Sequence, residues 1–77
     1  MKLTPLQREA LAYVGGTLGI RTRDVAYTLQ RPWQQAYQLM LALWARGFVA
    51  IQPALANNPP LWSITDAGIE VLEAQRV

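Results

Sequence analysis

Apolar residues recur with a helical period near the start of the chain. Leu6, Ala10 and Val14 fall on one face of a 3.6-residue repeat. Thr4 can cap the first free amides, a proline follows at the first helical position, and Gln7 can close a capping box. A glycine pair then interrupts the run. The pattern predicts a first helix that begins directly after Thr4 and ends at position 14 or 15.

A second, shorter helical pattern follows at positions 22 to 29. Thr22 is the expected cap, and Asp24 would lie in the first turn, where the helix dipole favours a negative charge. Val25, Ala26 and Leu29 recur at the spacing of an inward face. We therefore expect about two turns of helix here.

The third helical pattern runs from about Pro32 to Arg46. Proline suits the first position of a helix and disfavours helical angles at the residue before it, so a tight turn is expected at positions 30 and 31. Gly47 can end this helix. Its expected inward residues are Ala36, Leu39, Met40 and Leu43.

The hydrophobic pattern then becomes typical of strands. Residues 48–51 and 61–64 are short β-prone runs, and the intervening segment is rich in asparagine and proline. These runs predict an antiparallel hairpin with a long tip, in which Gln52 and Pro53 close the first strand. Phe48, Ile64 and Trp62 are expected to fill the core.

A last helix is predicted after Thr65, which can cap it. Asp66 would lie in its first turn, and Ile69, Leu72 and Val71 would form its inward face. The order is helix, helix, helix, strand, strand, helix, which is mainly α with a small β-hairpin. At 77 residues, the chain is expected to form a single domain over 1–77.

The amino-acid composition argues against several classes of function. The chain has no cysteine and no histidine, so thiolate metal sites, disulfides and the commonest proton shuttle are absent. The acidic residues form no cluster suited to metal binding or acid–base catalysis; they are Glu9, Asp24, Asp66, Glu70 and Glu73. We therefore expect no enzyme activity, no cofactor, no metal and no small-molecule substrate.

The chain start shows neither the apolar run of a signal peptide nor a membrane-spanning stretch. A cytoplasmic protein without membrane association is the expectation. The net charge of +2 is compatible with nucleic acid, and three arginines lie close together in sequence.

Three segments resemble the winged helix-turn-helix family of DNA-binding domains. Residues 24–29 are similar to its second helix, and residues 40–49 resemble the end of its recognition helix, with a basic residue before the glycine stop. Ile64-Thr65-Asp66-Ala67-Gly68 resembles the segment that leaves the wing in small bacterial or phage regulators of the MarR and PadR type. The resemblance covers residues 4 to 75 and implies a winged helix-turn-helix fold that binds double-stranded DNA.

In that fold the N-terminal half of the third helix enters the major groove. Glutamine suits this role, since its amide can donate to and accept from the edge of adenine. Surface aromatic residues can contact thymine methyls, the sugar-phosphate backbone or another protein. The residues expected to read bases are Trp33, Gln34, Gln35, Tyr37 and Gln38.

Phosphate contacts are expected from Arg21, Arg23 and Arg31, together with amides at helix N-termini. Polar contacts from the wing are expected from Gln52, Asn57 and Asn58. The wing tip has no basic residue, so insertion of a basic side chain into the minor groove is not expected.

The third helix also carries a second apolar stripe, made of Tyr37, Leu41 and Trp44. A helix that is apolar all round is buried on both sides. The stripe could be covered by the rest of the chain, by a second copy in a homodimer, or by a different protein. Two hypotheses therefore stay open: a DNA-binding transcriptional regulator, and a winged-helix protein-interaction module that does not bind DNA.

Overall fold

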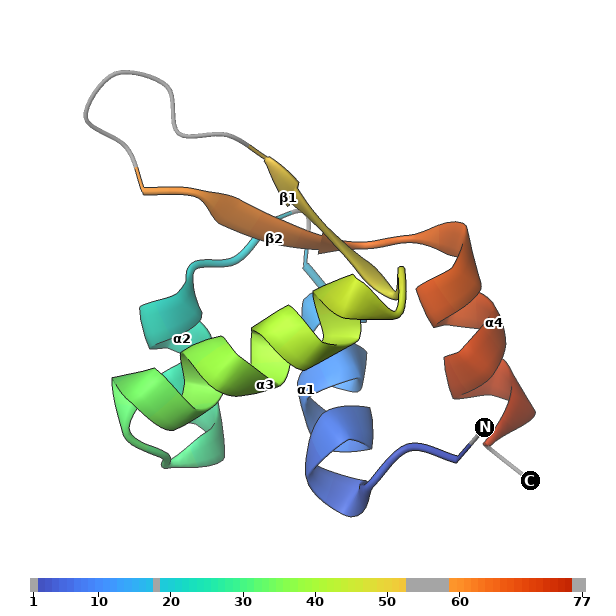
Figure 1. Ribbon diagram of the computed structural model, residues 1–77, viewed down its shortest axis with the longest axis horizontal. Coiled ribbons are helices and arrows are strands. Elements are labelled where there is room, and N and C mark those ends of the chain that lie inside the picture. The colour runs from blue at the N-terminus through green and yellow to red at the C-terminus, as the bar shows by residue number, and fades with distance from the viewer. Residues whose placement is uncertain (1, 18, 53–58, 76–77) are drawn as a thin grey trace.

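In the part of the chain that the structure describes, four helices and one hairpin follow one another in the order predicted from the sequence (Figure 1). The computed structural model describes residues 2–17, 19–52 and 59–75. Its mainly helical class, with a small antiparallel hairpin, confirms the expected fold class. The elements are α1 (Pro5–Gly15), α2 (Thr22–Leu29), α3 (Trp33–Ala45), β1 (Val49–Gln52), β2 (Leu61–Ile64) and α4 (Asp66–Ala74).

The start of α1 is fixed by a capping box. The Thr4 hydroxyl accepts a hydrogen bond from the Gln7 amide at 3.1 Å, and the Gln7 side-chain carbonyl accepts one from the Thr4 amide at 3.0 Å. Two of the amides that a helix start leaves free are satisfied in this way. The predicted cap and both helix ends are therefore confirmed.

Removal of the Thr4 cap should destabilise the start of α1. We expect Thr4→Ala to lower the free energy of unfolding by about 1 kcal/mol, since it leaves a helix amide without its acceptor. Urea denaturation followed by circular dichroism measures the difference. Thr28→Ala is the matched control, because Thr28 is exposed inside α2 and caps no helix. Equal effects of the two substitutions would show that the capping box adds nothing to stability.

The start of α2 differs from the prediction. Thr22 is the first helical residue and not the cap; its hydroxyl accepts a hydrogen bond from the Trp62 indole nitrogen at 2.8 Å. Arg21 takes the cap position, and its amide donates to the Asp24 carboxylate at 3.4 Å. The Thr22 side chain therefore contacts the hairpin instead of capping α2.

The turn between α2 and α3 is tight. Gln30 has a left-handed backbone (φ 54°), and the Arg31 amide donates back to the Ala26 carbonyl at 3.0 Å. Pro32 occupies the N-cap position of α3 without a side-chain hydrogen bond, and not the first helical position that was predicted. The helix begins at Trp33, one residue later than predicted, and ends one residue earlier, at Ala45. The two helices are thus joined as a helix-turn-helix.

A glycine lies between the third helix and the hairpin, as predicted. Gly47 has φ 79°, a conformation that other residues rarely adopt, and it separates α3 from β1. Val49 pairs with Ile64, and Ile51 pairs with Trp62 in the antiparallel register. The first strand is shifted by one residue from the expected run, and Gln52 belongs to it, because this pairing continues to Leu61.

The hairpin is tied to the helices by a further backbone bridge. Ile20, just before α2, exchanges two hydrogen bonds with Trp62, at 3.0 and 2.7 Å. Trp62 is thus held through its backbone by Ile20 and through its side chain by Thr22. These contacts fix the hairpin against the start of α2.

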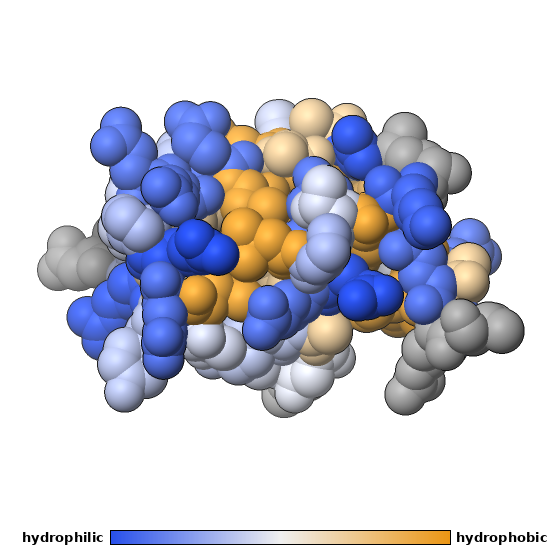
Figure 2. Space-filling view, turned by 90° about the horizontal axis from the view of Figure 1, so that it is seen from below, coloured by the Kyte–Doolittle hydropathy of each residue, from blue (hydrophilic) through white to orange (hydrophobic). Residues whose placement is uncertain are grey.

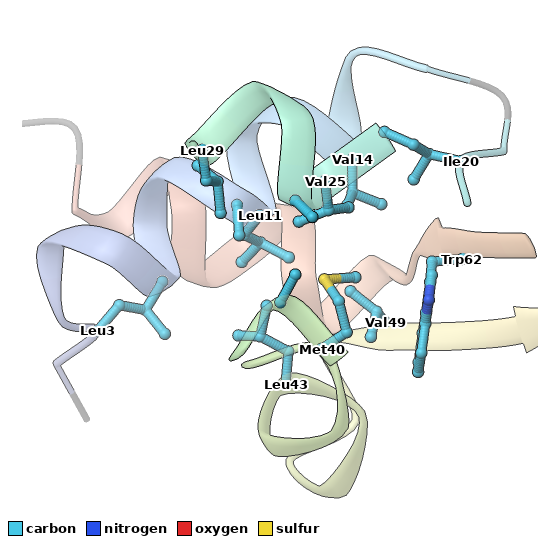
Figure 3. Packing of buried hydrophobic residues seen from close by; sticks show 13 residues of the cluster. Leu3, Leu11, Val14, Ile20, Val25, Leu29, Met40, Leu43, Val49 and Trp62 are labelled. Atoms are coloured by element: carbon cyan, nitrogen blue, oxygen red, sulfur yellow. The ribbon is translucent and has the colours of Figure 1, made fainter. Parts of the chain in front are cut away.

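The core lies between the first three helices and the hairpin (Figure 3). Met40 lies near the middle of the cluster, and Trp62 lies on its strand side, 2% exposed. Leu39 is half-buried, whereas Phe48 and Ile64 pack against the cluster without being fully buried. The buried apolar residues are Leu3, Ala10, Leu11, Val14, Ile20, Val25, Ala26, Leu29, Ala36, Met40, Leu43, Val49 and Trp62.

The last helix, α4, docks through a glycine. The Thr65 hydroxyl accepts from the Gly68 amide at 3.1 Å, which confirms the predicted cap, and it donates to the Gly47 carbonyl. Gly68 is buried against the backbone of Phe48. Ile69, predicted to face inward, is 42% exposed, because the side of α4 that carries Gly68 makes the closest approach. The other two predicted inward residues, Val71 and Leu72, are half-buried against the core.

Candidate nucleic-acid interface

The N-terminal half of α3 presents polar side chains to solvent. Gln34, Gln35 and Gln38 are exposed, and Trp33 is 53% exposed. On the opposite side of the helix the buried residues are Ala36, Met40 and Leu43, which fix the helix to the core. A 3.6-residue period accounts for this division, so the orientation of the glutamines is set by core packing.

Tyr37 is half-buried, although it was predicted to lie on the exposed front. Its ring stacks on Trp33, with centroids 5.0 Å apart and planes 12° apart, and it meets Trp62 edge-on at 6.5 Å. Stacked and edge-to-face arrangements are the favoured geometries of aromatic pairs. Tyr37 therefore supports Trp33 from behind and joins α3 to the hairpin.

The predicted phosphate-binding arginines lie at the start of α2 and in the turn before α3. Arg23 and Arg31 are exposed and Arg21 is half-buried. Arg21 and Arg23 belong to the start of α2, whereas Arg31 lies in the turn before α3. Across residues 2–17, 19–52 and 59–75, none of the three guanidinium groups has an ion-pair partner, so their charges are available to an anion.

Two of these arginines share a cleft with the aromatic residues of α3. The cleft has a volume of about 460 Å³ and lies between the start of α2, the start of α3 and the hairpin. Arg21 and Arg23 line it together with Trp33 and Tyr37. The remaining lining residues are Thr22, Ile51, Pro59, Pro60 and Trp62.

The sequence interpretation missed part of this cleft. Ile51, Pro59 and Pro60 were not among its candidate residues, and Arg31 does not line the cleft. The four-residue spacing of Trp33 and Tyr37 was a usable signal, because side chains so placed on a helix are neighbours. Contacts between the hairpin and α2 had no comparable signal in the sequence.

The predicted wing residues are only partly described. Gln52 is exposed at the end of β1, beside Ile51. Asn57 and Asn58 lie outside the described residues.

The second apolar stripe of α3 is divided by the fold. Tyr37 and Leu41 are half-buried and pack against the core. Trp44 is 51% exposed. The rest of the chain therefore covers part of Tyr37 and Leu41. That the stripe binds another chain stays a prediction.

No three potential metal-ligating side chains come together in the part of the chain that the structure describes. None of the helices described is long and apolar enough to cross a bilayer.

The sequence matches no protein-family model and no curated protein, but the fold resembles several solved transcription regulators. MepR from Staphylococcus aureus, a transcription regulator of the multidrug efflux pump MepA, is 24% identical with a TM-score of 0.86. The match covers 95% of this chain and 55% of that one.

Two further structures show the same likeness. MepR in complex with DNA is 24% identical with a TM-score of 0.84, over 94% of this chain and 60% of that one. Regulator Tm0710 from Thermotoga maritima is 25% identical with a TM-score of 0.83, over 91% of this chain and 50% of that one. This chain therefore spans between half and two thirds of the length of these regulators. Its fold is the winged helix-turn-helix, as the sequence resemblance implied.

Proposed function

We propose that this protein binds double-stranded DNA in a sequence-specific manner, as a small transcriptional regulator whose helix α3 reads the major groove. The observation that carries the proposal is the exposure of Gln34, Gln35 and Gln38 on one side of a helix whose other side is buried. A fold shared with MepR, which has been solved in complex with DNA, supports the same function.

The glutamines can supply the base contacts. A glutamine amide can form a bidentate pair with adenine, which is worth about 1–3 kcal/mol of discrimination against a wrong base. Gln34 and Gln35 lie in the first turn of α3 and Gln38 lies one turn further on. All three lie in the helix half that enters the groove in helix-turn-helix proteins. Trp33 would contact a sugar or a thymine methyl.

The arginines can contact the DNA backbone beside the reading helix. Arg31 lies in the turn before α3, while Arg21 and Arg23 line the cleft at the start of α2. With three to four ionic contacts, we expect each bound protomer to contribute about −3 to −4 to the slope of the logarithm of affinity against the logarithm of salt concentration. Gln52, Asn57 and Asn58 would add polar contacts from the wing.

Removal of one arginine should change this salt dependence by a defined amount. We expect Arg23→Gln to make the slope shallower by about 0.9 for each bound protomer and to weaken binding to all sequences alike, because a phosphate contact carries no base information. Fluorescence anisotropy of a labelled duplex at several salt concentrations measures the slope.

Arg8→Gln is the matched control for that experiment. It removes the same charge from an exposed position on α1, away from α2 and α3. An equal change of slope in both variants would mean that net charge, and not a placed contact, drives the binding.

A dimeric protein on a palindromic DNA site forms part of the proposal. Two copies would double the number of phosphate contacts and compensate for the small basic charge of one protomer. The exposed Trp44 is one candidate for the contact between copies.

A second candidate function is a protein-interaction module that does not bind DNA. Exposed aromatic side chains favour it, since Tyr27 is 87% exposed and Trp44 is 51% exposed. Figure 2 shows, on the face at the bottom of Figure 1, an apolar area in the centre with hydrophilic side chains on both sides. Retention on a DNA column that falls with salt supports the regulator, whereas no retention together with salt-insensitive binding of one protein supports the module.

A further inference from the structure

The cleft between α2, α3 and the hairpin has the size of a small-molecule site. Its volume of about 460 Å³ lies within the range of roughly 300–1,000 Å³ that is typical of ligand pockets. Aromatic rings of Trp33 and Tyr37 form one wall, and Ile51 and two consecutive prolines contribute apolar surface elsewhere. A predominantly apolar cleft with a few charged groups is the usual form of a site for an organic ligand.

The aromatic wall is held rigid by contacts behind it. Trp33 stacks on Tyr37, Tyr37 meets the edge of Trp62, and the Trp62 indole donates a hydrogen bond to Thr22. Trp33 nevertheless remains 53% exposed, so part of its indole surface is free for a further stacking partner. A fixed wall of this kind favours a planar ring over a flexible chain.

The charged groups of the cleft are both cationic. Arg21 and Arg23 line it, and no acidic residue does so among the residues that the structure describes. Guanidinium groups bind phosphate through charge-assisted hydrogen bonds, and two of them match the double charge of a phosphate monoester. The cleft therefore combines surface for a flat ring with charge for a phosphate.

We propose that this cleft binds one nucleotide unit, with its base stacked on Trp33 and its phosphate at Arg21 and Arg23. The nucleotide could come from two sources with the same chemistry: a free mononucleotide, or an unpaired nucleotide of a bound DNA strand. Only the second source rests on the proposed function. Binding of the free nucleotide is measured without any duplex, so failure of this site and failure of duplex binding are distinguishable.

Nuclear magnetic resonance tests the site through the three indole N–H signals of the chain. We expect deoxyadenosine 5′-monophosphate to shift the signals of Trp33 and Trp62, while Trp44 on the far part of α3 serves as an internal control. Deoxyadenosine and deoxyribose 5-phosphate should each bind at least about tenfold more weakly, because each lacks one of the two recognised groups. Equal affinity for deoxyribose 5-phosphate would reduce the site to a simple anion site and overturn the proposal, as would the absence of shifts at Trp33.

Two variants probe the two halves of the site. Trp33→Leu, and separately the pair Arg21→Gln with Arg23→Gln, should each weaken nucleotide binding about tenfold. Arg8→Gln is the matched control for the loss of positive charge; Arg8 lies outside the cleft, and this variant should bind as the wild type does. Titration calorimetry measures the affinities, and all variants replace residues outside the buried core. Unchanged binding in either cleft variant would contradict the assignment.

A final comparison identifies the source of the nucleotide. A duplex with one unpaired adenine that binds more tightly than its fully paired equivalent, and shifts the Trp33 signal further, would assign the cleft to a DNA strand. A mononucleotide that binds and equally weakens both duplexes would assign it to a free nucleotide. Loss of binding to both the mononucleotide and the unpaired adenine would overturn the site itself.

Discussion

Replacement of Trp62 by alanine is expected to remove a large part of the stability of this domain. Trp62 is 2% exposed and is the largest fully buried side chain in the described core. Truncation of such a residue costs about 3–5 kcal/mol, from lost burial and from the cavity left behind. A domain of 77 residues has about 4–12 kcal/mol of stability at the usual amount per residue.

Trp62→Ala should lower the free energy of unfolding by more than the cavity alone would. The indole hydrogen bond to Thr22 and the edge contact with Tyr37 disappear together with the ring. Trp62→Phe keeps most of the packing and loses the hydrogen bond, so we expect an intermediate loss of about 1–2 kcal/mol.

Urea denaturation of three variants tests this prediction. Trp44→Ala is the matched control, because Trp44 is 51% exposed and its removal should change stability by less than about 1 kcal/mol. Equal losses for Trp44→Ala and Trp62→Ala would show that the hairpin is not anchored through Trp62.

Gly68→Ala is expected to destabilise the docking of α4. A Cβ atom at this position would lie 2.2 Å from the Phe48 carbonyl oxygen and 2.8 Å from a side-chain carbon of Ile64. The carbonyl belongs to the backbone and cannot turn aside as a flexible side chain would, so the helix must move. Overpacking of this kind costs about 3 kcal/mol, partly offset by the better helix propensity of alanine, which contributes about 0.5–1 kcal/mol.

Gly15→Ala provides a control for the glycine substitution. There, among the described residues, the added Cβ would meet only side-chain carbons, of Ile64 at 3.2 Å and of Leu72 at 3.9 Å. We expect near-neutral stability for Gly15→Ala and a clear loss for Gly68→Ala, measured as unfolding midpoints on heating. A Gly68→Ala variant as stable as the wild type would mean that α4 can dock at another distance from the hairpin.

Elements set by local interactions were predictable from the sequence. Thr4 and Gln7 are three residues apart, and Thr65 and Gly68 have the same spacing, so both caps follow from sequence neighbours. Gly47 follows the end of α3 with a positive φ, which glycine adopts more easily than other residues, so this signal is also local. The order of elements followed from these signals and from the hydrophobic period.

Features set by tertiary contacts were not predictable in the same way. Thr22 lost its expected capping role because its hydroxyl is bound by Trp62, forty residues away in sequence. Ile69 is exposed because α4 approaches the hairpin through Gly68, and periodicity alone does not define that rotation.

In the candidate site, too, features set by local sequence were predictable and features set by tertiary contacts were not. The glutamines of α3 were correctly placed on the exposed face, since the inward residues of the helix define it. The cleft was not predicted, because Arg21, Trp33 and Ile51 come from three different elements. Their proximity depends on the bridge between Ile20 and Trp62, which no local pattern indicates.

The central claim is that the glutamines of α3 read DNA, and selection from a random duplex pool tests it most directly. The wild type should enrich one sequence motif, and Gln35→Ala with Gln38→Ala should lose about tenfold or more of the preference for that motif, at about 1–3 kcal/mol per lost base contact. Glu70→Gln, an exposed change on α4, should select the motif unchanged. Enrichment of no motif by the wild type, or of the same motif with equal affinity by the double variant, would contradict the claim.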